Sequence, residues 1–437
     1  MKTTITNWGN YPVIEAEIST PSTVEKIQQT LFSSQELIVR GLGRSYGDSS
    51  LNTNIVSTQK LNRILKFTST GMLTCEAGVS LHEILQTFVS RGWFLPVTPG
   101  TKFVTVGGAI AADVHGKNHH IAGSFSNHLH SFDLMLSDGT IVTCTKENNA
   151  ELFWATCGGM GLTGIILQAT FQLIPIQSSY IKRETLKAKN LDEIMEIFES
   201  SLDWTYSVAW IDCLKEGNSS GRSIMMRGEH ALQDEIKSMK NILLIPEKST
   251  PSVPLFLPEF TLSSFAIKSF NFLYYTKARS EISFIDYETF FYPLDRILHW
   301  NRMYGKRGFT QYQFVLPKES SKEGLKKILQ KISQSGQGSF LAVLKLFGKQ
   351  ENYLSFPREG YTLALDFPIT KNLFPLLNEL DAMVADYDGR LYLAKDVRMS
   401  EQMFKRGYKN SEKFIALKYQ SDKERKFHSL QSKRIGI

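Results

Sequence analysis

The residues best suited to chemistry are concentrated in one stretch, Pro99 to His130, PGTKFVTVGGAIAADVHGKNHHIAGSFSNHLH. Histidine can ligate a metal, transfer a proton or fix a loop by hydrogen bonding. The stretch holds five of them: His115, His119, His120, His128 and His130. The Gly107-Gly108 pair lies between a β-branched run and a small-residue run, and glycine lets a backbone approach a flat ligand closely. This pattern predicts a ligand site.

A metal is one candidate ligand, but the spacing argues against zinc. Gly116 interrupts the helical spacing that would align His115 with the histidine pair after it. The cysteines contain no C-x-x-C pair and are widely separated, at Cys75, Cys144, Cys157 and Cys213. We therefore expect no structural metal, no disulfide framework and four buried free thiols.

A second glycine-rich segment, Gly41 to Asp48 (GLGRSYGD), follows a short strand predicted at Leu37–Arg40. It is not a Rossmann fingerprint, because its third glycine comes one residue late and no helical pattern follows. It also lacks the Gly-Lys-Ser/Thr ending of a P-loop. A strand that enters a glycine-rich turn can present backbone N–H groups to a phosphate, and Arg44 could add charge. A simple tight turn explains the segment equally well.

The 437-residue chain is 42% apolar and 21% charged, as expected for an ordinary globular protein of two domains. Its first residues lack the apolar core of a signal peptide, and no apolar run reaches the roughly 18 residues that a spanning helix needs. These features predict a cytoplasmic protein that could rest peripherally on the inner membrane.

The net charge of +7 equals the excess of ten Lys/Arg over three acidic residues between Lys405 and Arg434. Such a tail could bind nucleic acid or an anionic membrane surface. Apolar residues recur among its charges, at Phe404, Phe414, Leu417 and Phe427. This recurrence favours an amphipathic helix with a solvated basic face.

Periodicity in the first part predicts an α+β domain over residues 1–178. The predicted elements are a capped helix over 22–33, a strand over 73–77, a helix over 81–91 ended by Gly92, a hairpin around Asp138-Gly139 and a long apolar strand before Ile176. Residues 390–437 would complete this domain, after a strand over Leu391–Asp396.

The intervening residues 179–389 predict an α/β domain built on an antiparallel sheet. Its predicted helices cover 191–202, 322–333 and 373–385, and its predicted strands cover 206–210, 311–316, 340–347 and 361–367. The phenylalanine-rich segment 252–280 is poorly periodic. It is either a buried irregular loop or an exposed apolar flap over a site that accepts a lipid, and we favour the flap.

Five motifs occur in a fixed order: GLGRSYGDSSLN, the HGKNHH stretch, GGMGLTGII, QYQFVLP and LYLAKDVRM. Together they resemble the flavin oxidoreductases of the vanillyl-alcohol-oxidase type, which carry a PCMH-type FAD-binding domain. The resemblance spans nearly the whole chain. It implies a two-part FAD domain joined to a substrate domain, with the protein positioning a flavin that performs the redox chemistry.

The resemblance also assigns residues to FAD. Arg44 stands where relatives with covalent FAD often have histidine, so a non-covalent cofactor is expected. The implied cofactor residues are Val39, Arg40, Gly41, Leu42, Gly43, Arg44, Ser45, Tyr46, Gly47, Asp48, Ser49, Gly100, Thr105, Val106, Gly107, Gly108, Ala112, Asp113, Val114, His115, Ile165 and Tyr392. The glycines at 107 and 108 would let the backbone lie against the flavin ring, where a Cβ would clash.

For the reaction, the resemblance implies oxidation of a secondary sugar hydroxyl to a ketone, at the 2′-OH of a polyprenyl-phosphate ribose, as the first half of an epimerisation. Lys395 and His115 are the implied catalytic residues. The implied substrate-binding residues are Lys117, Gln311, Gln313, Lys345 and Lys395. Two positions depart from relatives: Ala364 replaces a frequent cysteine, and Phe291 stands where tyrosine can occur.

Three alternatives stay open at this point. A flavoenzyme of the same type could act on a soluble alditol or aldonolactone, although such a substrate gives no role to an apolar flap. The histidines could bind zinc, and the basic tail could bind nucleic acid, but neither has a supporting recognition motif. If the lipid-linked substrate is correct, the resemblance implies a partner keto-sugar reductase of the short-chain dehydrogenase type.

Overall fold

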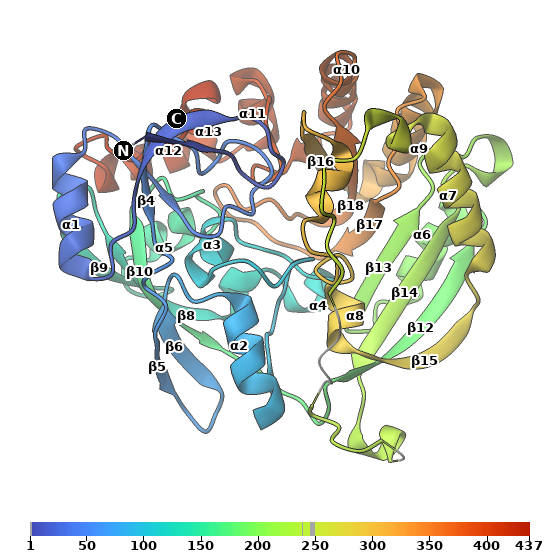
Figure 1. Cartoon of the computed structure of the whole chain (residues 1–437), viewed down its shortest axis with the longest axis horizontal. Helices are drawn as coiled ribbons and strands as arrows, with labels where there is room; N and C mark the ends of the chain where they lie inside the picture. Colours follow the sequence, from blue (N-terminus) through green and yellow to red (C-terminus); the bar gives the residue numbers. More distant parts are fainter. Residues whose placement is uncertain (1, 238, 245–249) are drawn as a thin grey trace.

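The computed structural model describes residues 2–237, 239–244 and 250–437. Within these ranges the strands form two larger groups, one on each side of the molecule, with the two chain ends close together (Figure 1). The chain has an α+β fold, and its largest sheet is antiparallel.

Two sheets organise the first part. A four-stranded sheet has the order β1-β2-β4-β3, and a five-stranded antiparallel sheet has the order β5-β6-β10-β8-β9. Their strands are β1 Lys2–Ile5, β2 Ile14–Ser19, β3 Ile38–Arg40, β4 Asn54–Ser57, β5 Ile64–Phe67, β6 Met72–Glu76, β8 Leu129–Met135, β9 Ile141–Thr145 and β10 Ile165–Gln172. A small pair joins β7 Trp93–Phe94 to β11 Ile174–Pro175.

The capped helices predicted in this part are confirmed. Helix α1 Val24–Ser33 begins at Thr23, whose side chain accepts a hydrogen bond from the backbone N–H of Lys26. Helix α2 Leu81–Phe88 begins with a Ser80–Glu83 capping box and continues as a 3-10 turn that Gly92 ends at φ +81°. The remaining short helices are α3 Val106–Ala111, α4 His119–Ala122 and α5 Ala150–Thr156.

An eight-stranded antiparallel sheet forms the second part, in the order β15-β12-β14-β13-β17-β18-β16-β19. Its strands are β12 Tyr180–Ala188, β13 Tyr206–Ile211, β14 Ser223–His230, β15 Glu281–Asp286, β16 Phe309–Pro317, β17 Ala342–Phe347, β18 Gly360–Pro368 and β19 Arg390–Leu391. Helices α6 Leu191–Glu199, α9 Lys318–Ser335 and α10 Leu373–Asp386 contact this sheet. The predicted helices and strands are therefore confirmed, with ends shifted by a few residues.

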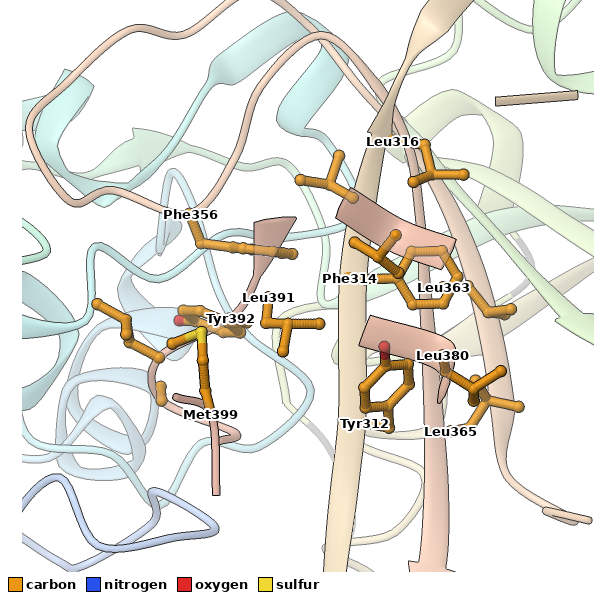
Figure 2. Close-up of a cluster of buried hydrophobic side chains, with 14 of the residues drawn as sticks. Tyr312, Phe314, Leu316, Phe356, Leu363, Leu365, Leu380, Leu391, Tyr392 and Met399 are labelled. Atoms are coloured by element: carbon orange, nitrogen blue, oxygen red, sulfur yellow. The ribbon is translucent and has the colours of Figure 1, made fainter. Parts of the chain in front are cut away.

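The main hydrophobic core lies between this sheet and its helices and extends to the C-terminal segment. Figure 2 shows Tyr312 and Phe314 of β16 beside Leu363 and Leu365 of β18, with Tyr392 and Phe356 on the other side of Leu391. The rings of Tyr392 and Phe356 are stacked with centroids 4.5 Å apart. This packing fixes the chain immediately before Lys395.

One alternative for the phenylalanine-rich segment is excluded and one predicted strand is wrong. Residues 264–277 form a helix, α7 Ser264–Lys277, with the apolar surface exposed as the favoured prediction expects, so the segment is not a buried irregular loop. The strand predicted over Leu391–Asp396 stops at Leu391, because the backbone N–H groups of Lys395 and Asp396 bond back to the carbonyl of Tyr392 and form a turn.

The basic tail forms three short helices and keeps the predicted solvated basic face. The helices are α11 Glu401–Gly407, α12 Ser411–Ser421 and α13 Leu430–Arg434, with Phe404, Phe414 and Phe427 buried as expected. Seven of the ten Lys and Arg side chains between Lys405 and Arg434 are exposed. Lys418 is an exception, because it is fully buried in an ion pair with Asp422.

The C-terminal segment returns to the first part of the chain. The N–H of Leu37 donates to the carbonyl of Lys426, and the N–H of His428 donates back to the carbonyl of Leu37. Among the residues that the structure describes, no helix is both long and apolar enough to cross a bilayer.

Candidate active site

A cavity of about 580 Å³ lies between the two parts of the chain, within the usual size range of cofactor and ligand sites of about 300–1,000 Å³. It brings together most of the predicted residues. Those that line it are Val39, Gly41, Leu42, Gly43, Arg44, Ser45, Tyr46, Ser49, Gly100, Thr105, Gly107, Gly108, Ala112, Val114, His115, Lys117, Gln311, Gln313, Lys345, Tyr392 and Lys395. Side chains separated by more than 350 residues in sequence therefore face one space.

Six predicted cofactor residues lie behind this lining: Arg40, Gly47, Asp48, Val106, Asp113 and Ile165. Val106 and Ile165 are buried in hydrophobic core. The Arg40 guanidinium bonds Asn7 and the carbonyl of Thr6, beneath Gly43. The Asp113 carboxylate accepts hydrogen bonds from Ser126, Gln350 and Ser355. These polar side chains hold the cavity loops in place from outside.

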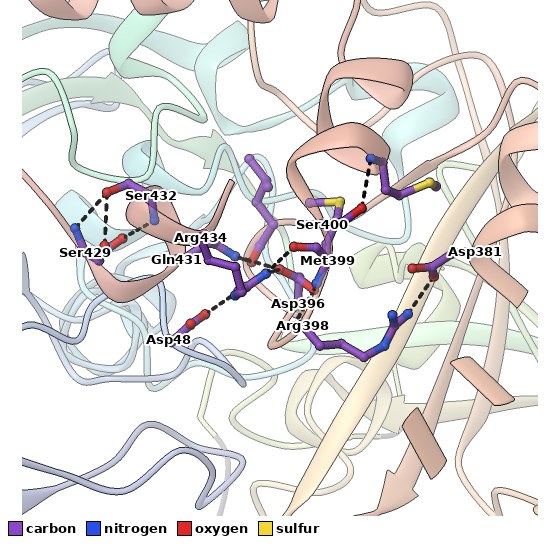
Figure 3. Close-up of polar contacts among 12 residues, drawn as sticks. Asp48, Asp381, Asp396, Arg398, Met399, Ser400, Ser429, Gln431, Ser432 and Arg434 are labelled. Carbon is purple, nitrogen blue, oxygen red and sulfur yellow. Dashed lines mark hydrogen bonds and ion pairs between the residues drawn. The ribbon is translucent and has the colours of Figure 1, made fainter. Parts of the chain in front are cut away.

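Asp48 and Gly47 connect the 41–48 loop to the C-terminal segment. Arg434 donates to Asp48 at 2.7 Å and forms an ion pair with Asp396 at 3.0 Å, as Figure 3 shows. A Cβ at Gly47 would clash with the carbonyl oxygen of Asp396. The loop and the turn that carries Lys395 are thus in direct contact.

The lining of the first part fits an FAD molecule. Gly43 has φ +63°, which a larger residue rarely adopts, and Thr105 caps α3 by accepting from the N–H of Gly108. Within the described ranges, the buried Nε of Arg44 and Oγ of Ser49 have no hydrogen-bond partner. Backbone turns with free polar atoms are suited to a diphosphate.

The structure gives Gly107 a different constraint from the predicted one. A Cβ there would lie 3.1 Å from the Cβ of Ala77, so this glycine allows α3 to pack against the end of β6. At Gly108 a Cβ would meet the side-chain oxygen of Thr105 at 3.1 Å. Close packing within the protein therefore favours glycine at both positions, and both glycines also line the cavity.

Three lysines converge on the other end of the cavity: Lys117, Lys345 and Lys395. Burial lowers the pKa of Lys117 to about 7 and that of Lys345 to about 8, and the charge of Lys345 contributes to the shift at Lys117. The Nζ of Lys117 donates to the carbonyl of Phe290 and lies over the Phe290 ring. Three cations in one enclosed space attract an anionic ligand such as a phosphate.

Lys395 faces a buried carboxylate, Asp366 of β18. Burial lowers the pKa of Lys395 and raises that of Asp366, while their mutual attraction opposes both shifts. Asp366 accepts a hydrogen bond from Gln311 at 2.6 Å and another from Tyr304 at 3.3 Å. Lys395 can therefore lose its proton far more easily than a solvated lysine.

His115 lies between these groups and is neutral. Burial lowers its pKa well below 6.5, and the charges of Lys345 and Lys395 lower it further. One ring nitrogen, Nε2, lies 3.3 Å from the amide nitrogen of Gln313, while the buried Nδ1 has no partner among the described residues. A neutral imidazole with an unused nitrogen can exchange a hydrogen bond with a substrate hydroxyl.

Three of the other histidines fix loops. His119 bonds Gln350 and accepts from the N–H of Gly348, His120 bonds the carbonyl of Trp204, and His128 bonds the carbonyl of Ala122. Over the described residues, no three His, Cys, Asp or Glu side chains are placed to hold a metal ion. The four cysteines are buried free thiols, as predicted.

Tyr392 and Ala364 occupy the positions expected of cavity residues. The hydroxyl of Tyr392 donates to the carbonyl of Ala112 at 3.1 Å, which ties the C-terminal segment to the central stretch. Ala364 and Phe291 both line the cavity. Neither supplies a polar atom, so the substitutions remove a thiol and a hydroxyl from the lining.

Sequence reasoning missed the apolar lobe of the cavity. One face of the large sheet contributes Ile285, Met226, Val208, Trp210 and Val343, with Arg183 near one edge, and Tyr274 of α7 also lines the lobe. Alternation along the strands could have indicated these residues, because Val208 and Trp210, like Val343 and Lys345, are two apart. Asp366 was also missed, although a lone acidic residue within the apolar run LALDFP is itself a signal.

Comparisons with known proteins found a matching family model and several relatives. A family model described as an FAD binding domain matches residues 17–145. The decaprenylphosphoryl-β-D-ribose oxidase of Mycolicibacterium smegmatis is 37% identical over 98% of this chain and 96% of its own length. An uncharacterised Streptomyces coelicolor protein from the mprA 5′ region is 31% identical over 82% of this chain and 100% of its own length. The L-gulonolactone oxidase of Bos taurus is 28% identical over 42% of each chain.

Proposed function

The chain belongs to the family of FAD-dependent oxidoreductases that includes decaprenylphosphoryl-β-D-ribose oxidase, and we propose that it oxidises the 2′-hydroxyl of a polyprenyl-phosphate ribose to a ketone. This step would be the first half of an epimerisation. The observation that carries the substrate assignment is the cavity itself. Its lysine cluster fits a phosphate, and an apolar lobe adjoins that cluster.

We propose that Lys117 and Lys345 bind the phosphate of the substrate. Both side chains line the cavity and are partly buried, and a phosphate would hold them in their charged forms against the cost of burial. The side-chain amides of Gln311 and Gln313 face the same space and would orient the ribose hydroxyls. Binding the anion next to the reacting carbon would restrict the sugar to one orientation.

Lys395 is proposed as the group that accepts the hydroxyl proton, at Nζ. Its lowered pKa allows a neutral amine near neutral pH, and Asp366 would stabilise the ammonium that forms. His115 would hydrogen-bond the same hydroxyl through its free nitrogen. As the O–H proton leaves, the C2–H hydrogen leaves as hydride and the carbonyl forms. FAD, when bound, supplies the two-electron acceptor for that hydride.

Arg44 supports a non-covalent cofactor. Its guanidinium carbon lies 4.0 Å from the centroid of the Trp8 ring, and Arg44 offers no nucleophilic atom comparable to a histidine nitrogen. We therefore expect FAD to leave the protein on denaturation. A soluble alditol or aldonolactone would leave both the lysine cluster and the apolar lobe without a ligand group.

The ketone requires a second reaction before an epimerised alcohol is obtained. We propose that a keto-sugar reductase of the short-chain dehydrogenase type consumes the product. We further propose that the protein works in the cytoplasm, in peripheral contact with the inner membrane, because both substrate and product carry a prenyl chain.

The site of oxidation can be tested with farnesylphosphoryl ribose carrying deuterium at C2 of the sugar. We expect the ketone to lose the deuterium and the absorbance of enzyme-bound FAD to fall several-fold more slowly than with the unlabelled compound. The same compound labelled at C3 is the control and should keep its deuterium. Loss of the C3 label, or no reaction with either compound, would contradict the proposal.

A further inference from the structure

Helix α7 differs from an ordinary surface helix, because it buries a polar side chain and exposes large apolar ones. Asn271 is fully buried and donates to Asp212 at 2.7 Å, and Ile267 and Tyr274 share its side of the helix. At about 100° per residue, the opposite side carries the large apolar residues. Their exposed fractions are 82% for Phe265, 57% for Phe272 and 52% for Leu273. We call these three residues the α7 outer face.

This grouping is unlike the single apolar residues that occur on most protein surfaces. Phe265 and Phe272 lie two turns apart, and Leu273 extends the surface to one side. Phe270 instead stacks on Tyr274, with ring centroids 5.7 Å apart. The preceding segment adds exposed Leu255 and Phe256. Contiguous exposed apolar side chains on one element mark a contact surface.

The charge around the α7 outer face is positive. Lys268 and Lys277 are exposed at its borders, Arg279 follows the helix, and the α7 sequence SFAIKSFNFLYYTK contains no acidic residue. Aromatic and leucine side chains with neighbouring lysines are the composition of helices that lie in a membrane interface. Cationic side chains are attracted to anionic lipid headgroups.

The inner side of the same helix forms part of the cavity wall. Tyr274 lines the cavity and packs edge-to-face on Trp210, another lining residue, with ring centroids 4.9 Å apart. Figure 1 shows α7 at the outer edge of the second part of the chain. One helix thus separates the apolar lobe from the exterior.

We propose that the α7 outer face docks on the surface of a bilayer that contains anionic lipid. The three apolar side chains enter the headgroup–acyl boundary, and Lys268 and Lys277 contact the anionic headgroups. This inference rests on the proposed function, because docking here lets a prenyl chain remain in the membrane while its sugar phosphate enters the cavity beside Tyr274. The helix, about 21 Å long at its 14 residues, lies flat on the surface.

The test is cosedimentation of the FAD-loaded protein with sucrose-filled vesicles, made of phosphatidylglycerol and phosphatidylcholine or of phosphatidylcholine alone. We expect binding to the mixed vesicles, at least tenfold weaker binding to neutral ones, and release by high salt. Substitution F265S/F272S/L273S should weaken binding at least tenfold, and K268E/K277E should remove the preference for anionic lipid.

The matched control is V13S/L65S/L202S, which removes three exposed apolar residues elsewhere and should bind as the wild type does. Equal binding of the two triple variants to the mixed vesicles would overturn the proposal. It would also be overturned if the wild-type protein does not bind vesicles and light scattering shows that it self-associates through α7.

Failure of docking and failure of the proposed function give different results. With water-soluble farnesylphosphoryl ribose, the α7 variants should retain wild-type kcat, because the outer face does not contact the cavity. With long-chain substrate in vesicles, their rate should fall at least fivefold. Oxidation of the soluble compound without any vesicle binding would overturn docking alone, whereas no oxidation of either compound would overturn the function.

Discussion

The Nζ of Lys395 lies 3.8 Å from the centroid of the Tyr46 ring. Tyr46 belongs to the glycine-rich loop near the start of the chain, and Lys395 to the turn that follows the last strand of the large sheet. The hydroxyl of Tyr46 accepts from Gln311, which also donates to Asp366. The cofactor loop and the proposed proton acceptor are therefore held in one buried network.

This network predicts the pH dependence of kcat. A neutral Lys395 is the active form, so kcat should rise with pH through a pKa far below the usual lysine value of about 10.4. Asp366→Asn removes the negative charge that raises this pKa, so the rising limb should move to lower pH. If the rising limb of kcat stays at the same pH in Asp366→Asn, or moves to higher pH, the Lys395–Asp366 pair is not its origin.

Replacing Lys395 itself should remove the proton acceptor. Lys395→Met should lower kcat by about 10²–10⁴, the usual contribution of a positioned acid or base, with FAD still bound as judged by its absorbance. Lys326→Met, at an exposed position on α9, is the control. Similar kcat values for the two variants would remove Lys395 from the reaction.

The phosphate site predicts a different pH effect, on KM. Lys117 and Lys345, with pKa values near 7 and 8, are charged below those values and neutral above them. KM for a phosphorylated substrate should therefore rise as the pH passes above about 8, and Lys345→Gln should raise KM about 10- to 100-fold, the loss of one charge-assisted hydrogen bond. Steady-state kinetics with methyl riboside, which has no phosphate, should show neither change.

Arg434 should be important for both stability and cofactor retention. Arg434→Ala leaves Asp48 and Asp396 buried without their shared cation, and removing one partner of a buried pair costs about 3–5 kcal/mol of unfolding free energy. Urea unfolding should also release FAD at lower concentration. Arg358→Ala breaks a more exposed pair with Asp388 and should cost under about 1 kcal/mol. Equal losses of unfolding free energy in the two variants would contradict the role of Arg434 as the cation shared by Asp48 and Asp396.

Ala364 offers a labelling test of the cavity. Burial raises the pKa of Cys75, Cys144 and Cys213 to about 12, so the native thiols should resist alkylation of the folded protein. Ala364→Cys places one thiol in the cavity lining, and mass spectrometry should find a single modification at that position. Bound substrate should slow this modification. Rapid labelling of the wild type would contradict the described burial.

The sequence patterns predicted most of the framework because strand alternation and helix capping are local signals. The converging side chains came from the resemblance to a known family rather than from local patterns, and Lys117, Gln311, Gln313, Lys345 and Lys395 all line one cavity. Asp366 went unrecognised because its partner arrives from a turn that local pattern predicted as a strand. That turn depends on long-range packing of Tyr392 against Phe356.

Two local features were not predicted from the sequence. A helix with phenylalanines outside and Asn271 inside has no ordinary amphipathic pattern, so α7 was not recognised as a helix, and Asn271 is buried because it donates to the distant Asp212. In the tail, Lys418 was expected to be solvated with the other cations, but the fold buries it with Asp422, four residues further along the chain.

The central claim is that one cavity holds FAD and a polyprenyl-phosphate ribose. The most direct measurement mixes the purified, FAD-loaded protein anaerobically with one equivalent of farnesylphosphoryl ribose and records the visible spectrum. The flavin bands should bleach within seconds, and xylitol or gulonolactone at the same concentration should leave them unchanged. Bleaching by the soluble sugars alone, or a protein that retains no FAD, would contradict the account.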